Sequence, residues 1–118
     1  MSAELKLSDL DLDQILNIVE PIMDNCLDGS NEGNHEKHTR DFTDRMKSIV
    51  TPEELQRQLS SNPKVYFTER RFLHLFRRTD SIGIVWKQFT SFNNDELINQ
   101  AIFKEVNGNI LIDHCMIC

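Results

Sequence analysis

The sequence contains no uninterrupted apolar run approaching the length of about 20 residues that crosses a lipid bilayer. Its first residues, MSAELK, also lack the apolar segment of a secretory signal peptide. Only three of the 118 residues are cysteines, and without an export signal we expect them to be free thiols in a reducing compartment. These absences favour a cytoplasmic protein without a membrane partner.

Basic residues are also fewer than acidic ones. The chain has 13 Lys and Arg against 19 Asp and Glu, which gives a formal net charge of −6. The basic pairs Arg70-Arg71 and Arg77-Arg78 are not part of a longer basic stripe. Because binding to a phosphate backbone needs clustered Lys and Arg side chains, this composition argues against nucleic acid as the main partner.

What is present resembles an ordinary globular composition, with 39% apolar and 27% charged residues. We expect one domain over residues 1–118, since domains of this length are common. A first helix is predicted by apolar residues at three- and four-residue spacing: Leu12, Ile15, Leu16, Val19, Ile22, Met23, Cys26 and Leu27. Ser8 with Asp11 is a weak capping signature, Pro21 predicts a kink or two helical pieces, and residues 28–34 predict a polar loop.

Two more helices are expected before residue 63. The second is predicted from about His35 to Ile49. The third begins at the sequence TPEE, where Thr51 can cap the helix, Pro52 suits its first position and Glu54 can reach back to the cap. It should end before Asn62-Pro63.

The second half predicts four strands, at about 64–77, 81–91, 97–106 and 109–117. Asn107-Gly108 between the last two is the preferred pair for a two-residue hairpin. The order of elements therefore predicts an α+β fold, in which three N-terminal helices pack on one face of a curved four-stranded antiparallel sheet.

The hairpin register predicts which side chains share a face. With Asn107-Gly108 as the turn, Phe103 lies opposite Ile112 and Ala101 lies opposite His114, so His114 joins the apolar core face. Burial lowers the pKa of a histidine, and a neighbouring group could make it a proton carrier. The alternative is a core histidine that hydrogen-bonds the backbone. Glu20 and Asp24, the acidic partners that the first helix offers, do not lie clearly on its apolar stripe.

The terminal sequence HCMIC raises the question of a metal, redox or lipidation site. Residues three apart on a strand point to opposite faces, so Cys115 and Cys118 should be plain strand thiols rather than a metal or dithiol pair. The C-a-a-X outline lacks an upstream polybasic stretch, which argues against prenylation. His35 and His38 are expected at a solvated helix end. We therefore expect neither a metal site nor a cofactor.

The first predicted hairpin places apolar residues on both faces. With Arg78 opposite Ser81, one face carries Leu73, Leu75, Ile84 and Trp86, and the other carries Phe72, His74, Phe76, Val85 and Phe89. A sheet covered by helices on one side should be polar on the other. A second apolar face therefore predicts a partner surface, most simply another copy of the chain.

The stretches DFTDRMKSIVTPEEL, RRFLHLFRRTDSIGIVWKQF and IFKEVNGNILIDH, in this order, resemble the nuclear transport factor 2-like superfamily, a cystatin-like α+β cone. The resemblance covers nearly the whole chain and rests on the order of elements. It implies a conical pocket between helices and sheet and frequent dimerisation through the sheet. Members include ketosteroid isomerase-like and polyketide cyclase-like enzymes as well as binding modules, and no catalytic set of these enzymes maps onto this chain.

The sequence thus predicts a pocket-bearing homodimer that binds a small apolar molecule or a protein partner, with Tyr66, Trp86 and His114 as ligand-binding residues. One alternative is an isomerase- or cyclase-type enzyme that uses His114 as its catalytic acid and base. Another is a purely structural dimerisation module whose cone is filled by its own side chains.

Overall fold

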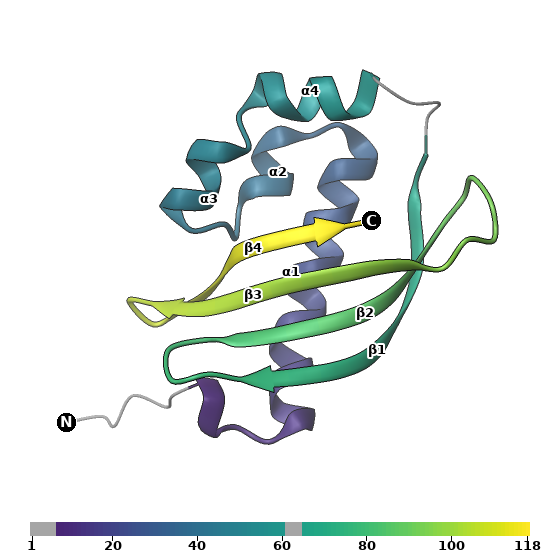
Figure 1. The fold of residues 1–118 in the computed structure, drawn as a ribbon. Coiled ribbons are helices and arrows are strands. Elements are labelled where there is room, and N and C mark those ends of the chain that lie inside the picture. The colour runs from purple at the N-terminus through teal and green to yellow at the C-terminus, as the bar shows by residue number, and fades with distance from the viewer. Residues whose placement is uncertain (1–6, 61–64) are drawn as a thin grey trace.

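The computed structural model describes residues 7–60 and 65–118 and has an α+β architecture (Figure 1). A short 3-10 helix at Leu7–Asp9 precedes α1 (Leu12–Glu32), α2 (His35–Thr39), α3 (Asp44–Ile49) and α4 (Pro52–Ser60). The strands β1 (Phe67–Arg77), β2 (Ile82–Thr90), β3 (Leu97–Val106) and β4 (Asn109–Ile117) form one antiparallel sheet in the order β1-β2-β3-β4. In Figure 1, α1 crosses one face of the sheet, and α2, α3 and α4 lie beyond the β4 edge.

Helix α1 is longer and less interrupted than the sequence predicts. Asp11, not Ser8, is its N-cap, and a capping box with Gln14 satisfies two backbone N–H groups. The helix continues through Pro21 as one element, which corrects the expectation of two pieces. Pro21 is exposed, whereas Val19 and Met23 on either side are buried against the sheet, so packing holds the helix together across the missing backbone donor.

The predicted polar loop at residues 28–34 is wrong, because most of it is the last turn of α1. The helix ends at Gly33, whose φ of 68° lies in the left-handed region that glycine adopts at low cost. The N–H of Gly33 donates to Ser30 O, and the N–H of Asn34 donates to Gly29 O. These two bonds satisfy carbonyls that the helix end would otherwise leave free.

The predicted second helix is divided into α2 and α3. Between them the chain pairs with the exposed edge of β4: Ile112 N donates to Asp41 O at 2.7 Å, and Thr43 N donates to Ile112 O at 3.0 Å. Thr43 then caps α3 by accepting from Met46 N. Covering a sheet edge satisfies strand groups that an unbroken helix would leave unpaired.

The predicted start of the last helix is confirmed, since Thr51 Oγ1 accepts from Glu54 N at 3.1 Å. The Glu54 carboxylate does not return to the cap and instead pairs with Arg57. The predicted end lies at Asn62-Pro63, outside the described residues, and α4 extends to Ser60.

The strands and the second hairpin follow the prediction closely. Asn107 and Gly108 have φ values of 53° and 84°, as a two-residue turn of this kind requires. Pairing is as expected from Val106↔Asn109 to Phe103↔Ile112, but the next pair is Ile102↔His114, so Asp113 is an extra residue in β4. This β-bulge reverses the alternation beyond it.

Because of this bulge, the predicted placement of His114 on the core face is wrong. Beyond Asp113, Cys115 and Ile117 face the core, and His114 lies on the opposite face beside Ile102. A physical reason for the extra residue is visible: Asp113 accepts hydrogen bonds from Thr43 Oγ1 at 2.8 Å and from Arg45 Nε at 3.2 Å, which joins β4 to α3.

A second bulge, at Leu73 in β1, produces the same kind of error. Phe72 pairs with Trp86 and His74 with Val85, so Leu73 is unpaired. Phe72, predicted on the outer face, packs against the core, and Leu73, predicted on the inner face, is 53% exposed. The predicted turn pairing is confirmed by the hydrogen bond from Arg78 N to Ser81 O.

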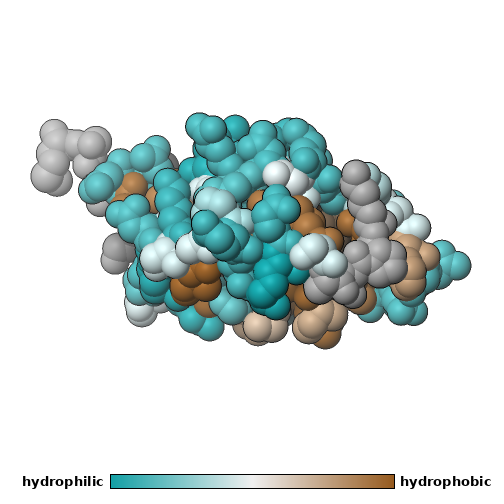
Figure 2. Space-filling model, turned by 90° about the horizontal axis from the view of Figure 1, so that it is seen from above, coloured by the Kyte–Doolittle hydropathy of each residue, from teal (hydrophilic) through white to brown (hydrophobic). Residues whose placement is uncertain are grey.

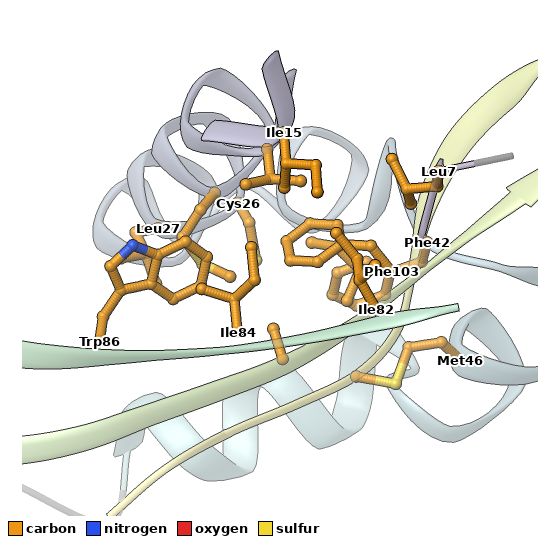
Figure 3. Close-up of a cluster of buried hydrophobic side chains, with 14 of the residues drawn as sticks. Leu7, Ile15, Cys26, Leu27, Phe42, Met46, Ile82, Ile84, Trp86 and Phe103 are labelled. Atoms are coloured by element: carbon orange, nitrogen blue, oxygen red, sulfur yellow. The ribbon is translucent and has the colours of Figure 1, made fainter. Parts of the chain in front are cut away.

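The core lies between α1 and the sheet. Figure 3 shows Trp86, Ile84 and Ile82 projecting from the sheet toward α1, where Ile15, Cys26 and Leu27 meet them. Phe103 packs edge-on against Trp86, with ring centroids 6.2 Å apart. Burying these side chains supplies the main driving force for folding.

The outer face of the sheet, opposite α1, carries many apolar side chains that the core does not cover: Phe76, Val85, Phe89, Ile98, Ile102, Leu111 and Met116. Seen from above in Figure 2, hydrophilic atoms cover the helical side, and brown and tan atoms collect along the opposite, sheet-side edge. None of the helices described within residues 7–60 is long and apolar enough to cross a membrane.

Candidate functional site

A cavity of about 1120 Å³ opens where the helices meet the end of the sheet that carries the β2–β3 loop. Its walls come from the end of α1, from α2 and α4, from the start of β1 and from the end of β4. Apolar residues make up somewhat more than half of the lining and include Leu27, Phe42, Val50, Leu59, Phe67 and Ile117. The polar remainder includes Asn31, Glu32, His38 and Asp95. A concave site that combines apolar and polar groups can hold a small molecule.

Two cysteines are part of the wall of this cavity. Cys26 projects from α1 and is 2% exposed, and Cys115 projects from β4 and is half-buried. Interaction with the Cys115 thiol, together with burial, raises the pKa of Cys26 well above the usual cysteine value. The same interaction lowers the pKa of Cys115, against the effect of burial.

His38 of α2 lies next to Cys26. Its Nδ1 is 2.7 Å from the carbonyl oxygen of Cys26 and 3.6 Å from Cys26 Sγ. Because a carbonyl only accepts hydrogen bonds, Nδ1 carries the proton, and the neutral ring has its free lone pair on Nε2. Burial lowers the pKa of His38, an effect that the hydrogen bond to Cys26 partly opposes.

Two fully buried amides continue the polar contacts into the sheet. Asn99 Nδ2 donates to Gln88 Oε1 at 3.1 Å, and Gln88 Nε2 donates to the carbonyls of Glu69 and Phe89. The Cys115 thiol approaches Asn99 Oδ1 at 3.9 Å. Polar contacts therefore run from β1 and β2 through Asn99 to Cys115, and a separate contact joins Cys26 to His38 of α2, within an otherwise apolar interior.

The predicted ligand-binding residues lie elsewhere. The described residues that line the cavity do not include Tyr66, Trp86 or His114. Trp86 is fully buried in the core, Tyr66 is on the surface before β1, and His114 is on the outer face of the sheet. These three residues therefore do not line the described cavity, and the bulge at Asp113 explains why Cys115 takes the inner-face position predicted for His114.

Trp86 instead belongs to an ionic cluster that ties α1 to the sheet. Glu20 Oε2 accepts from Trp86 Nε1 at 3.0 Å, and Glu20 Oε1 accepts from Arg70 Nε at 2.9 Å. Arg70 also donates to Asp24 at 2.7 Å, and its guanidinium lies 5.4 Å from the centre of the Trp86 ring. Glu20 and Asp24 therefore pair with Arg70 and not with His114.

His35 and His38 are not a solvated helix end. His35 Nε2 lies 2.7 Å from the carbonyl oxygen of Val50, and His38 contacts Cys26, so both rings hold neighbouring segments together. In the part of the chain that the structure describes, no group of three or more His, Cys, Asp and Glu side chains is placed to hold a metal ion. Sequence spacing does not reveal that Cys26 and Cys115 line the same cavity, because this depends on the packing of distant segments.

Comparison with known proteins supports the fold but gives no family. No family model matches the chain, and no curated protein matches its sequence. The structure is similar to that of a DUF4783 family protein from Bacteroides uniformis ATCC 8492, with a TM-score of 0.51 and 14% identity over 80% of this chain and 93% of the other. It is also similar to one from Bacteroides ovatus ATCC 8483, with a TM-score of 0.50 and 15% identity over 79% and 90%. At this identity the likeness concerns the fold alone.

Proposed function

We propose that this chain is a ligand-binding domain of the nuclear transport factor 2-like type, which holds a small, largely apolar molecule in the cavity between helices and sheet. The observation that carries the proposal is the size of the cavity, about 1120 Å³, together with a wall of which apolar residues make up somewhat more than half. A fold selected only as a dimerisation module would gain stability by filling such a space with its own side chains. The space therefore favours the binding function over the purely structural one.

Polar groups of the wall would orient the ligand. Cys26 lies beside His38 in the wall, and Asn31 lies near its β1 side, where its amide holds the backbone of Phe67. Polar groups at fixed positions beside apolar side chains are the usual means of orienting a bound ligand. An acid–base role for His114 has no geometric support, since its imidazole lies on the other face of the sheet.

We also propose that two copies associate through the outer face of the sheet. The apolar residues of this face are interspersed with Arg71, Lys87 and Lys104, and each of these pairs with an acid of the same chain, namely Glu69, Glu96 and Asp80. The face therefore has no excess of one charge that would repel a second copy. Covering its apolar residues would remove them from water, which favours association.

A charge placed in the cavity wall tests the ligand site. Leu59→Asp should weaken binding of the apolar fluorescent dye anilinonaphthalene sulfonate by about tenfold or more, which corresponds to about 1.4 kcal/mol, because it puts a carboxylate against the apolar ligand. Fluorescence titration measures the dissociation constant. Leu59 is 36% exposed on α4, so the variant should fold, and circular dichroism checks that it does.

The matched control is Ile49→Asp, which makes the same change at an exposed position of α3 that is not part of the described lining. It should bind the dye as the original chain does. Equal affinities of the Leu59→Asp and Ile49→Asp proteins, or no binding by the original chain, would contradict the proposed ligand site.

A further inference from the structure

His38 brings to the cavity wall a hydrogen-bonding nitrogen that the fold itself does not use. Its ring is half-buried and lines the cavity. Nδ1 is occupied, since it donates to the carbonyl oxygen of Cys26 at 2.7 Å, whereas Nε2 has no hydrogen-bond partner among the described residues. No side-chain nitrogen or oxygen in the described part of the chain is both fully buried and without a partner, so Nε2 reaches accessible space.

The ring is held in a tautomer whose Nε2 can only accept. Because Nδ1 carries the proton that it donates to Cys26, Nε2 of the neutral ring has a lone pair and no proton. Burial lowers the pKa of His38 and so favours the neutral form. Asn25 Nδ2 donates to the carbonyl oxygen of Lys37 at 2.8 Å, and Phe42 packs edge-on against the His38 ring. These contacts fix the acceptor in place before a ligand arrives.

Two other polar side chains of the wall are already engaged within the chain. Asn31 uses both ends of its amide, because Nδ2 donates to Phe67 O at 2.9 Å and Oδ1 accepts from Phe67 N at 2.8 Å. Thr90 Oγ1 accepts from Phe92 N. The acceptor on His38 differs from these groups, since its hydrogen-bonding capacity is left for a molecule in the cavity.

We propose that the ligand of the cavity carries a hydroxyl or N–H group on its apolar body and donates it to Nε2 of His38. This inference rests on the ligand site proposed above and names the chemistry that the site selects: an apolar alcohol, phenol or amide rather than a hydrocarbon or an ether. A ligand without a donor displaces water from Nε2 and leaves this acceptor unpaired, which lowers its affinity.

The experiment compares 2-naphthol with its methyl ether, which has the same ring system but no donor. Displacement of anilinonaphthalene sulfonate at neutral pH gives the dissociation constant of each compound. We expect the preference for 2-naphthol over the ether to fall by about fivefold in the His38→Phe protein, the effect of losing one hydrogen bond between neutral groups. The use of a ratio cancels any general change in the cavity that the substitution causes.

His35→Phe is the matched control. It removes the other imidazole of α2, which also holds a backbone carbonyl but is not among the described residues that line the cavity. This protein should keep the preference of the original chain. Equal preferences in the original chain and the His38→Phe protein would overturn the inference.

Nitrogen NMR of the original chain with labelled histidines provides a second test that needs no substitution. The Nε2 signal of His38 should move toward the position of a hydrogen-bonded nitrogen with 2-naphthol and stay in place with the ether. A signal that 2-naphthol does not move overturns the inference. If both compounds displace the dye but His38 does not respond, the ligand site stands without this contact; if neither displaces it, the ligand site fails as well.

Discussion

Gly29 shows how closely α1 and α2 approach each other. A Cβ atom on this residue would lie 2.3 Å from the backbone nitrogen of His38 and 2.5 Å from its Cα. Backbone atoms cannot rotate away as a side chain can, so the contact requires glycine. The same approach brings the His38 ring to the carbonyl of Cys26 and thereby sets one wall of the cavity.

We therefore expect Gly29→Ala to lower the free energy of unfolding by about 2 kcal/mol or more, despite the higher helix propensity of alanine. Asp28→Ala, at the neighbouring exposed position of α1, should change it by less than about 0.5 kcal/mol. Urea denaturation measures both. A Gly29→Ala protein as stable as the Asp28→Ala protein would show that the two helices are not in contact at this point.

Between elements, the cluster of Glu20, Arg70 and Trp86 joins α1 to the sheet. The Arg70 side chain is 9% exposed and that of Glu20 is 33% exposed, so their ion pair is partly shielded from water. Lys37 and Glu32 form a comparable pair at the surface. A shielded charge that loses its partner costs more than an exposed one, because water cannot replace the lost interaction.

Glu20→Gln should accordingly destabilise the fold by about 2 kcal/mol, because it leaves Arg70 with a weaker partner. The matched Glu32→Gln change should cost less than about 1 kcal/mol. Thermal unfolding of the two variants under the same conditions makes the comparison. Similar losses would mean that the cluster does not anchor α1.

The sequence predicts those elements whose signals are local. The strands at 97–106 and 109–117 follow from alternation and from Asn107-Gly108, and the start of α4 follows from its cap at Thr51. The division of the second predicted helix and the helical conformation of residues 28–32 depend on contacts between distant segments, so local signals do not predict them. Gly29 and Gly33 look like loop residues in the sequence, but one serves a helix crossing and the other a helix end.

The predicted placement of His114 on the inner face is wrong for one physical reason, the β-bulge in β4. Alternation assigns faces correctly up to Ile112, and the single extra residue Asp113 then exchanges His114 for Cys115 on the inner face. What favours the bulge is the contact of Asp113 with Thr43 and Arg45, about 70 residues earlier in the chain. The sequence pattern of one strand contains no signal for such a contact.

At the scale of the whole molecule, the outer face of the sheet is the surface through which we propose that two copies associate. Ile98, in the middle of this face, is 51% exposed. In a dimer formed through the sheet, Ile98→Asp would bury a carboxylate without a partner, which costs several kcal/mol. We expect this variant to be a monomer at concentrations where the original chain and the Ile49→Asp control are dimers.

Sedimentation velocity at high micromolar concentration distinguishes these outcomes. If the original chain is a monomer, the proposed dimer is wrong. If the Ile98→Asp protein is still a dimer, the interface is on another surface. Dye binding in the cavity should be unaffected by this substitution, because Ile98 is not among the described residues that line the cavity.

The central claim is that the inner cavity, and not the outer apolar face, takes up the ligand. It is tested most directly by a two-dimensional amide NMR titration of the chain with anilinonaphthalene sulfonate. The account predicts that the largest shifts fall on the cavity wall, at Leu27, His38, Phe67, Cys115 and Ile117. Shifts concentrated at Phe76, Ile98 and Ile102 on the outer face, or no shifts at saturating dye, would contradict it.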